Sequence, residues 1–260
     1  MPAFSFVQVS DHHLTAREDG LTRGFSPAYS LRAVLRDIAS RVGDGIEFVL
    51  STGDLVEPAS AEAYGSARAL LGLDGEVEPA GAVRLRAEGL DLPAYLFPGN
   101  HDEPALLFGR GPAHTSFEHD GVRFVWVDWG RDGRAAADGE LFAFLEHALA
   151  DGRPTIVVTH HHLVPLGARW LDQLLPAEPE LDRFFEIVAG GRVLAILSGH
   201  AHTTYEQTVA GLPVYGIAAT SFQFALTDEP LLTLEPPAYR VVTVDDGGVT
   251  TRVYQVPLPD

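Results

Sequence analysis

The feature of this chain that most restricts its fold is an alternation of short apolar segments with amphipathic ones from residue 4 to residue 202. Residues 4–9 and 46–50 are short, apolar and rich in β-branched or aromatic side chains, which predicts buried strands. Residues 27–42 carry apolar side chains at helical spacing, with Ser26 as a candidate N-cap and Pro27 at the first helical position. Strands that alternate with helices predict an α/β fold.

The same patterns predict the remaining elements. We expect further strands at residues 94–97, 122–127, 155–158 and 193–197, and further helices at residues 60–71, 139–150 and 181–189. After residue 204 the pattern changes to strands joined by turns, at residues 205–209, 213–217, 239–244 and 250–254, and no helix fits there. Residues 74–90 are rich in Gly, Glu and Ala and carry no assignable pattern. Without a repeat or a low-complexity linker, residues 1–260 are interpreted as one domain with two sheets and outer helices.

Possible metal ligands follow five of the predicted strands. The clusters are Asp11-His12-His13, Gly53-Asp54, Gly99-Asn100-His101-Asp102, His160-His161-His162 and Gly199-His200-Ala201-His202. Each cluster alone has a purely structural interpretation as a turn, a helix cap or a satisfied core histidine. Ligand sites of α/β sheets, however, lie beyond the carboxyl ends of the strands, where the five clusters would converge. Together they indicate a metal site.

The spacing within two clusters suggests how the ligands face. In an extended segment, alternate side chains point to the same side. Asp11 and His13 are therefore expected to face one ion while His12 faces elsewhere, and the same alternation places His200 and His202 together.

Other positions suggest further roles. The carboxylate of Asp54 has two oxygens and could bridge two cations about 3.5–4 Å apart. Asn100 offers a neutral carbonyl oxygen, and His101 could act beside the reaction as an acid or hydrogen-bond donor. Asp102 could fix the tautomer of that histidine.

Composition limits the chemistry of the site. The chain has no cysteine, which excludes thiolate ligands, disulfides and a cysteine nucleophile, so a transition metal must use imidazole, carboxylate, amide or water. The formal net charge of -18 argues against binding to a nucleic-acid polymer or to an anionic membrane. The first residues have neither a basic region nor a long apolar stretch, and no segment approaches about 20 apolar residues, so we expect a cytoplasmic protein.

In this order the five motifs resemble those of the calcineurin-like metallophosphoesterases, and they span residues 11 to 202. Within that family the chain is similar to the bacterial class III cyclic nucleotide phosphodiesterases. That finer resemblance lies in residues 10–14, 53–56, 160–162, 170–173 and 219–224.

The resemblance implies a four-layer αββα sandwich of two mixed sheets flanked by helices. It implies one metal ion held by Asp11, His13 and His202, a second held by Asn100, His160 and His200, and Asp54 as the bridge. His101 would be the catalytic histidine, with Asp102 behind it. The family has His-x-Pro after the strand that precedes His160, whereas His162 stands where proline is expected, so His161 and His162 remain alternatives as the ligand.

The implied activity is hydrolysis of a phosphodiester in a small substrate, with a 3',5'-cyclic nucleotide such as cyclic AMP as the leading candidate. Alternatives on the same centre are a phosphomonoesterase or another phosphodiesterase, for instance one acting on glycerophosphodiesters, and a scaffold without catalysis is a third. Side chains expected to discriminate among substrates are His12, His161, Trp170, Asp172 and Phe222. Nitrogen and oxygen ligands permit Mn, Fe, Zn, Co or Ni, and of these we expect Mn or Fe, with Zn third. The resemblance also allows a homodimer.

Overall fold

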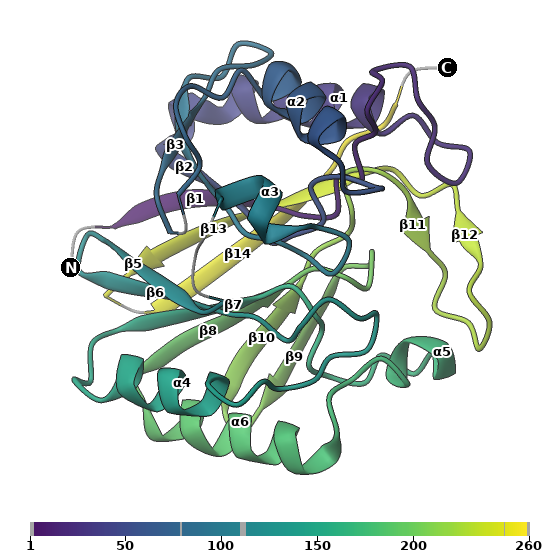
Figure 1. Cartoon of the computed structure of the whole chain (residues 1–260). Coiled ribbons are helices and arrows are strands. Elements are labelled where there is room, and N and C mark those ends of the chain that lie inside the picture. The colour runs from purple at the N-terminus through teal and green to yellow at the C-terminus, as the bar shows by residue number, and fades with distance from the viewer. Residues whose placement is uncertain (1–2, 79, 110–112, 247, 259–260) are drawn as a thin grey trace.

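The computed structural model describes residues 3–78, 80–109, 113–246 and 248–258, and in it two mixed six-stranded sheets face each other (Figure 1). The strands of the first sheet, in spatial order, are β14 (Gly248–Gln255), β13 (Ala238–Asp245), β1 (Phe4–Val9), β2 (Ile46–Ser51), β4 (Leu92–Leu96) and β3 (Val83–Leu85). Those of the second are β5 (Thr115–His119), β6 (Val122–Val127), β7 (Thr155–Thr159), β8 (Val193–Ser198), β10 (Leu212–Gly216) and β9 (Tyr205–Val209). A small separate hairpin consists of β11 (Gln223–Phe224) and β12 (Leu232–Thr233).

Helices cover the outer face of each sheet (Figure 1). On the first sheet lie α1 (Pro27–Arg41), the 3-10 turn η1 (Val42–Asp44), α2 (Ala61–Leu71) and the short α3 (Pro104–Phe108). On the second lie α4 (Leu141–Leu149) and α6 (Glu178–Gly190), while the short α5 (Arg169–Asp172) lies near the hairpin. The predicted αββα sandwich is therefore confirmed.

The layers are held together by an apolar core between the sheets and by one between each sheet and its helices. Between the sheets the core is aromatic, and the rings of Phe6 and Phe48 stack with centroids 4.8 Å apart. The helical spacing predicted for residues 27–42 brings Leu31, Val34 and Ile38 onto the buried face of α1. Burying such a face is worth several kcal/mol at about 25 cal/mol per Å² of apolar surface, which is why the amphipathic pattern specifies where the helix lies.

The predicted strands and helices lie where the pattern placed them, within a few residues at their ends. Among the described residues after 204 the structure has strands and no helix, as expected. The pattern missed β5, whose Thr115–His119 segment is mostly polar and only half-buried, and the short β3, which pairs with β4 inside the unassigned residues 74–90. No helix in the described part of the chain is long and apolar enough to cross a membrane.

Parallel pairing brings the loops that carry the predicted ligands to one edge. Val9 at the end of β1 lies opposite Ser51 of β2, which in turn lies opposite Leu96 of β4. In the second sheet Val158 of β7 lies opposite Leu197 of β8. Since parallel strands end at the same edge of a sheet, the five loops that follow these strands begin side by side.

Candidate metal centre

Seven side chains from the five loops meet in one buried network. On one side of it, Nε2 of His13 lies 3.1 Å from Nε2 of His202, which lies 3.4 Å from Oδ1 of Asp11. On the other side, Oδ1 of Asn100 lies 3.0 Å from Nε2 of His160 and 2.9 Å from Nδ1 of His200. The structure thus brings together the side chains that the sequence analysis grouped into two ligand sets.

Asp54 joins the two groups through a single oxygen. Its Oδ2 lies 3.5 Å from Nε2 of His13 and 3.3 Å from Nε2 of His160. Its other oxygen, Oδ1, accepts a hydrogen bond from the backbone N–H of His101 at 2.9 Å. One oxygen therefore lies between the two groups, and the other orients the loop that carries His101.

The backbone at these positions differs from the expected extended conformation. Asp11, His13, Asp54, His200 and His202 all have positive φ, between 48° and 67°. Non-glycine residues adopt this left-handed region at a cost of order 1–3 kcal/mol, and such residues cluster at functional sites. Asp11 and His13 do face the same group, but because both residues are left-handed after β1 has ended, and not because of strand alternation.

Two glycines permit the close approach of the loops. A Cβ atom at Gly53, which has a φ of +116°, would overlap the ring of His160, and a Cβ atom at Gly99 would overlap the carboxylate of Asp54. A larger residue at either position would push one ligand-bearing loop away from another. The glycines that precede Asp54 and Asn100 in the sequence motifs are thus explained by packing around the centre.

The donor set suits metal ions. Ligand atoms about 2.0–2.2 Å from a shared cation lie about 3–3.5 Å from each other, which is the spacing within each group. Asp54 is buried, and although burial raises its pKa, the imidazole of His160 holds that pKa well below its usual range. Burial lowers the pKa of His160, but the Asp54 carboxylate outweighs it and raises the pKa to about 9. Buried carboxylates thus draw positive charge into the centre, and metal cations bound to neutral imidazoles would supply it.

The three adjacent histidines, at positions 160, 161 and 162, contact different groups. His160 contacts Asp54 and Asn100, and its Nδ1 lies 2.9 Å from the carbonyl oxygen of Thr52. Nε2 of His161 lies 2.9 Å from the carbonyl oxygen of Asp132, and Nε2 of His162 lies 3.1 Å from that of Leu171. Of the three alternatives left open by the sequence, His160 is the one whose side chain contacts both Asp54 and Asn100.

Asp102 lies where the resemblance did not place it. Its carboxylate accepts hydrogen bonds from the backbone N–H groups of Leu55 (2.9 Å), Val56 (3.3 Å) and Gly99 (2.8 Å) and from the Tyr64 hydroxyl (2.9 Å). Burial and the nearby Asp54 charge raise its pKa to about 6. Through these hydrogen bonds Asp102 holds the loop that carries Asp54 against the loop that carries Asn100.

Replacing Asp102 with alanine is expected to destabilise the protein by about 3 kcal/mol, because three buried N–H groups lose their acceptor. Tyr64→Phe is the control: it removes one of the four hydrogen bonds to Asp102 together with the bond that the Tyr64 hydroxyl accepts from the backbone N–H of Glu103 at 2.8 Å, and it should cost about 1–2 kcal/mol. Urea unfolding of both variants in a chelating buffer measures the difference without a contribution from metal binding. Equal stability of Asp102→Ala and the unmodified chain would contradict the role of Asp102 in holding the two loops together.

The carboxylate that lies close to His101 is that of Glu57, a residue that the sequence analysis did not single out. Its Oε1 lies 3.6 Å from Nδ1 of His101, and its Oε2 lies 2.9 Å from Nδ1 of His13. The His13 imidazole beside it lowers the pKa of Glu57. A signal was present in the sequence, because Glu57 follows Asp54 by three residues and extends the polar cluster past two apolar side chains.

Two of the expected pocket residues, the buried His12 and the half-buried Asp172, hydrogen-bond to neighbouring parts of the chain. Nδ1 of His12 lies 2.7 Å from Oγ1 of Thr220 and its Nε2 lies 2.9 Å from Oγ of Ser51, so it faces away from the ligands as predicted. Burial lowers the pKa of His12 to about 4, which keeps the ring neutral. Asp172 accepts a hydrogen bond from the backbone of Leu166 at 2.7 Å.

Phe222 is also buried, and its ring packs against the rings of His13 and His202, with centroids 5.1 Å and 4.6 Å away. Trp170 is half-buried, and its ring lies 4.8 Å from that of Phe224. Of the five residues expected to discriminate among substrates, Trp170 and Asp172 keep some exposure to solvent, whereas His12, His161 and Phe222 are buried.

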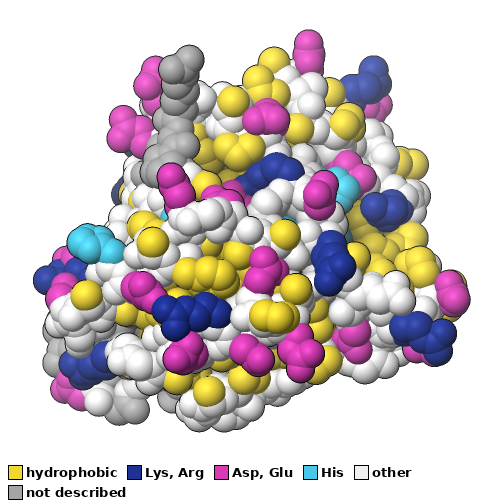
Figure 2. Space-filling model, turned by 60° about the horizontal axis from the view of Figure 1, so that its bottom comes forward, with side chains coloured by type: hydrophobic (Ala, Val, Ile, Leu, Met, Phe, Trp, Pro, Cys, Tyr) yellow, Lys and Arg dark blue, Asp and Glu magenta, His cyan; other side chains and the backbone are white. Residues whose placement is uncertain are grey.

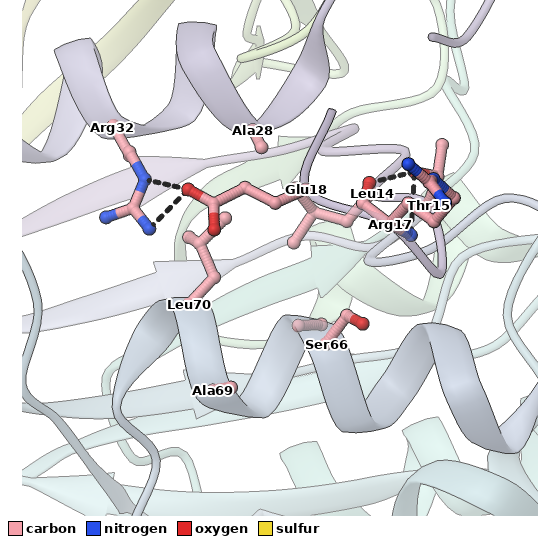
Figure 3. Close-up of a pocket in the computed structure, with 10 residues that line it drawn as sticks. Leu14, Thr15, Arg17, Glu18, Ala28, Arg32, Ser66, Ala69 and Leu70 are labelled. Carbon is pink, nitrogen blue, oxygen red and sulfur yellow. Dashed lines mark hydrogen bonds and ion pairs between the residues drawn. The ribbon is translucent and has the colours of Figure 1, made fainter. Parts of the chain in front are cut away.

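A separate cavity of about 210 Å³ lies between α1, α2 and the loop after His13 (Figure 3). Polar side chains that line this cavity already form hydrogen bonds with neighbouring residues. Arg32 donates to Glu18 at 2.7 Å and Arg17 donates to Asp19 at 2.8 Å. We therefore place the chemistry at the centre and not in this cavity.

Comparison with known proteins agrees with the motifs. The model of the family described as calcineurin-like phosphoesterase matches residues 4–204. A probable cyclic nucleotide phosphodiesterase of Synechococcus is 30% identical, with 97% of this chain and 92% of that protein covered. The 3',5'-cyclic adenosine monophosphate phosphodiesterase CpdA of Haemophilus influenzae is 28% identical, with 98% of this chain and 91% of that protein covered.

Solved structures show the same fold at low sequence identity. Purple acid phosphatase PPD1 of yellow lupin superposes with a TM-score of 0.68 at 15% identity, covering 100% of this chain and 53% of that one. GAP50, the anchor in the inner membrane complex of Plasmodium, superposes with a TM-score of 0.63 at 11% identity, covering 99% and 90%. An acid phosphatase and an anchor thus share this fold, so activity must be argued from the site.

The family model covers most of the chain, and the near full-length relatives are named as phosphodiesterases. Calcineurin-like phosphoesterases are dinuclear metal enzymes, and the converging carboxylates and imidazoles described above fit that chemistry. The chain belongs to the calcineurin-like phosphoesterase family and is a metal-dependent phosphoesterase.

Proposed function

We propose that this phosphoesterase hydrolyses 3',5'-cyclic nucleotides, with cyclic AMP as the leading substrate. Support comes from the names of relatives that are 28–30% identical over nearly the whole chain. We assign one metal ion to Asp11, His13 and His202, the other to Asn100, His160 and His200, and the bridging position to Asp54. The observation that carries the assignment is the single Asp54 oxygen that contacts both ligand groups.

The metal ions, when bound, supply charge neutralisation at the phosphate and lower the pKa of a water molecule for attack on phosphorus. His101 is the proton donor to the leaving oxygen, a role that typically contributes about 10²- to 10⁴-fold to the rate. Its side chain is 33% exposed, so a substrate can reach it. Oε1 of Glu57 lies 3.6 Å from Nδ1 of His101, so we assign Glu57 the role of positioning the ring.

The assigned ligands are nitrogen and oxygen atoms only, and we propose Mn or Fe as the native metals, with Zn, Co or Ni able to substitute. The test is removal of metal with a chelator, followed by reloading with one metal at a time and assay with cyclic AMP, bis(4-nitrophenyl) phosphate, 4-nitrophenyl phosphate and a glycerophosphodiester. We expect Mn or Fe to restore the highest kcat/KM for cyclic AMP. A higher kcat/KM for the monoester or for the glycerophosphodiester would replace the proposal by that activity, and absence of any turnover would favour the scaffold.

The remaining expectations form part of the same proposal. We propose a single domain over residues 1–260, a cytoplasmic location and a homodimer as an allowed assembly. The net charge of -18 supports a small phosphoester substrate over a nucleic-acid polymer or a membrane surface. Figure 2 shows one face of the molecule, on which acidic side chains are interspersed with arginines.

A further inference from the structure

Planar side chains lead from the metal centre toward the solvent. The ring of Phe224 on β11 lies 4.9 Å from the ring of His202, and the ring of Trp170 on α5 lies 4.8 Å beyond it. Both Phe224 and Trp170 are half-buried, so each keeps part of its surface exposed. A row of aromatic side chains that begins at a ligand position and reaches the solvent is suited to a flat substituent of the substrate.

The guanidinium of Arg23 lies next to these aromatic rings. The central carbon of its guanidinium lies 5.3 Å from the ring centroid of Phe222 and 5.9 Å from that of Phe224. One of its nitrogens lies 3.7 Å from Oε1 of Glu57, the oxygen that is 3.6 Å from Nδ1 of His101. The guanidinium therefore lies beside the proposed proton donor, while 43% of the Arg23 side chain remains exposed.

The geometry points to a base-binding wall made of Arg23, Phe224 and Trp170, which stacks against the nucleobase while the cyclic phosphate is held at the metals. This inference rests on the proposed function, and it names the part of the substrate that the metal ligands do not recognise. Aromatic rings and the planar guanidinium stack on any nucleobase, because every base has a π-face. The wall would therefore select nucleotides as a class and reject phosphodiesters that lack a planar group.

The charge of Arg23 must be separated from its planar shape. The chain carries a formal charge of -18, and the substrate is an anion. Arg23 is a partly exposed cation beside His101, where it also offsets the Glu57 carboxylate. A lysine at this position would keep the charge but would lose the flat surface that stacks on a base. Comparison of arginine with lysine therefore separates attraction of the phosphate from stacking of the base.

The test compares two competitive inhibitors with the same phosphate group, AMP and ribose 5-phosphate, against hydrolysis of bis(4-nitrophenyl) phosphate by the metal-loaded enzyme. In the unmodified chain the inhibition constant of AMP is expected to be about 10-fold or more below that of ribose 5-phosphate, the gain that base stacking typically supplies. Arg23→Gln, Arg23→Lys and Phe224→Leu should each reduce this ratio to below about 3-fold and leave ribose 5-phosphate binding unchanged. Trp170→Phe keeps a ring and should preserve most of the ratio.

Arg17→Gln is the matched control, because Arg17 is another exposed arginine of the same loop that pairs with Asp19 and should not alter the ratio. Equal weakening of both inhibitors by Arg23→Gln, with recovery in Arg23→Lys, would show that Arg23 serves the phosphate charge and would overturn the base-binding wall. An unchanged ratio in Arg23→Gln and Phe224→Leu would overturn it as well. Failure of the unmodified enzyme to cleave cyclic AMP would reject the proposed function alone, since the AMP to ribose 5-phosphate ratio is measured with a different substrate.

Discussion

Asp54→Ala is expected to lose both metal ions and to reduce phosphodiester turnover by at least about 10³-fold. The reason is that one Asp54 oxygen contacts both ligand groups, 3.5 Å from Nε2 of His13 and 3.3 Å from Nε2 of His160. Removing it leaves each group short of a ligand and takes a buried negative charge away from the centre. Metal content by elemental analysis, together with kcat for bis(4-nitrophenyl) phosphate, measures both losses.

Asp54→Asn is the control that separates charge from shape. An amide oxygen at this position can still accept the hydrogen bond from the His101 backbone, which Asp54 receives at 2.9 Å. The asparagine variant should therefore keep its fold and lose less metal than the alanine variant, although its activity should remain well below that of the unmodified chain. Full metal content and full turnover in Asp54→Ala would contradict the two-metal centre.

His101→Ala is expected to lower kcat for cyclic AMP by about 10²- to 10⁴-fold while both metal ions stay bound. The His101 ring lies beside the ring of His13, with centroids 5.1 Å apart, and outside both ligand groups. A proton donor matters most for a poor leaving group. The loss should therefore be large for cyclic AMP, whose leaving oxygen is an alkoxide, and much smaller for bis(4-nitrophenyl) phosphate, whose nitrophenolate leaves without a proton.

Glu57→Gln keeps the size of the side chain near His101 and removes its charge, so we expect a smaller loss in kcat of about 10-fold. His119→Ala is a control at a distant histidine, whose Nε2 pairs with Glu47 at 2.7 Å. It should leave kcat unchanged. The same fractional loss for both substrates in His101→Ala would argue against proton donation, and loss of metal in that variant would place His101 among the ligands.

Much of this protein could be predicted from local patterns. Alternating apolar segments predicted β1, α1 and β2 because burial of a strand or a helix face depends on nearby residues in the chain. Polar clusters after strands predicted a shared site because parallel strands end at one edge of a sheet. β5 was missed because its side chains are mostly polar, so it lacks the apolar pattern on which the prediction depends.

The details of the centre depended on contacts between loops that are far apart in the chain. Asp102 was expected to support His101, but its carboxylate is held by N–H groups of residues 55, 56 and 99, and no local pattern encodes such partners. Glu57 lies close to His101 instead, across a distance set by how two loops pack. The choice of His160 over His161 and His162 likewise follows from the position of Asp54 in space.

The sequence by itself determined the α/β sandwich, the identity of the polar clusters and their convergence at one edge, because all three follow from periodicity and strand direction. Only the tertiary structure decided where the clustered side chains point. Five of these residues adopt left-handed backbone that their residue types disfavour: Asp11, His13, Asp54, His200 and His202. The glycines at 53 and 99 let the loops that carry Asp54, Asn100 and His160 approach each other. That conformation is maintained by the packing of five loops against each other, which is a property of the folded chain and of no single segment.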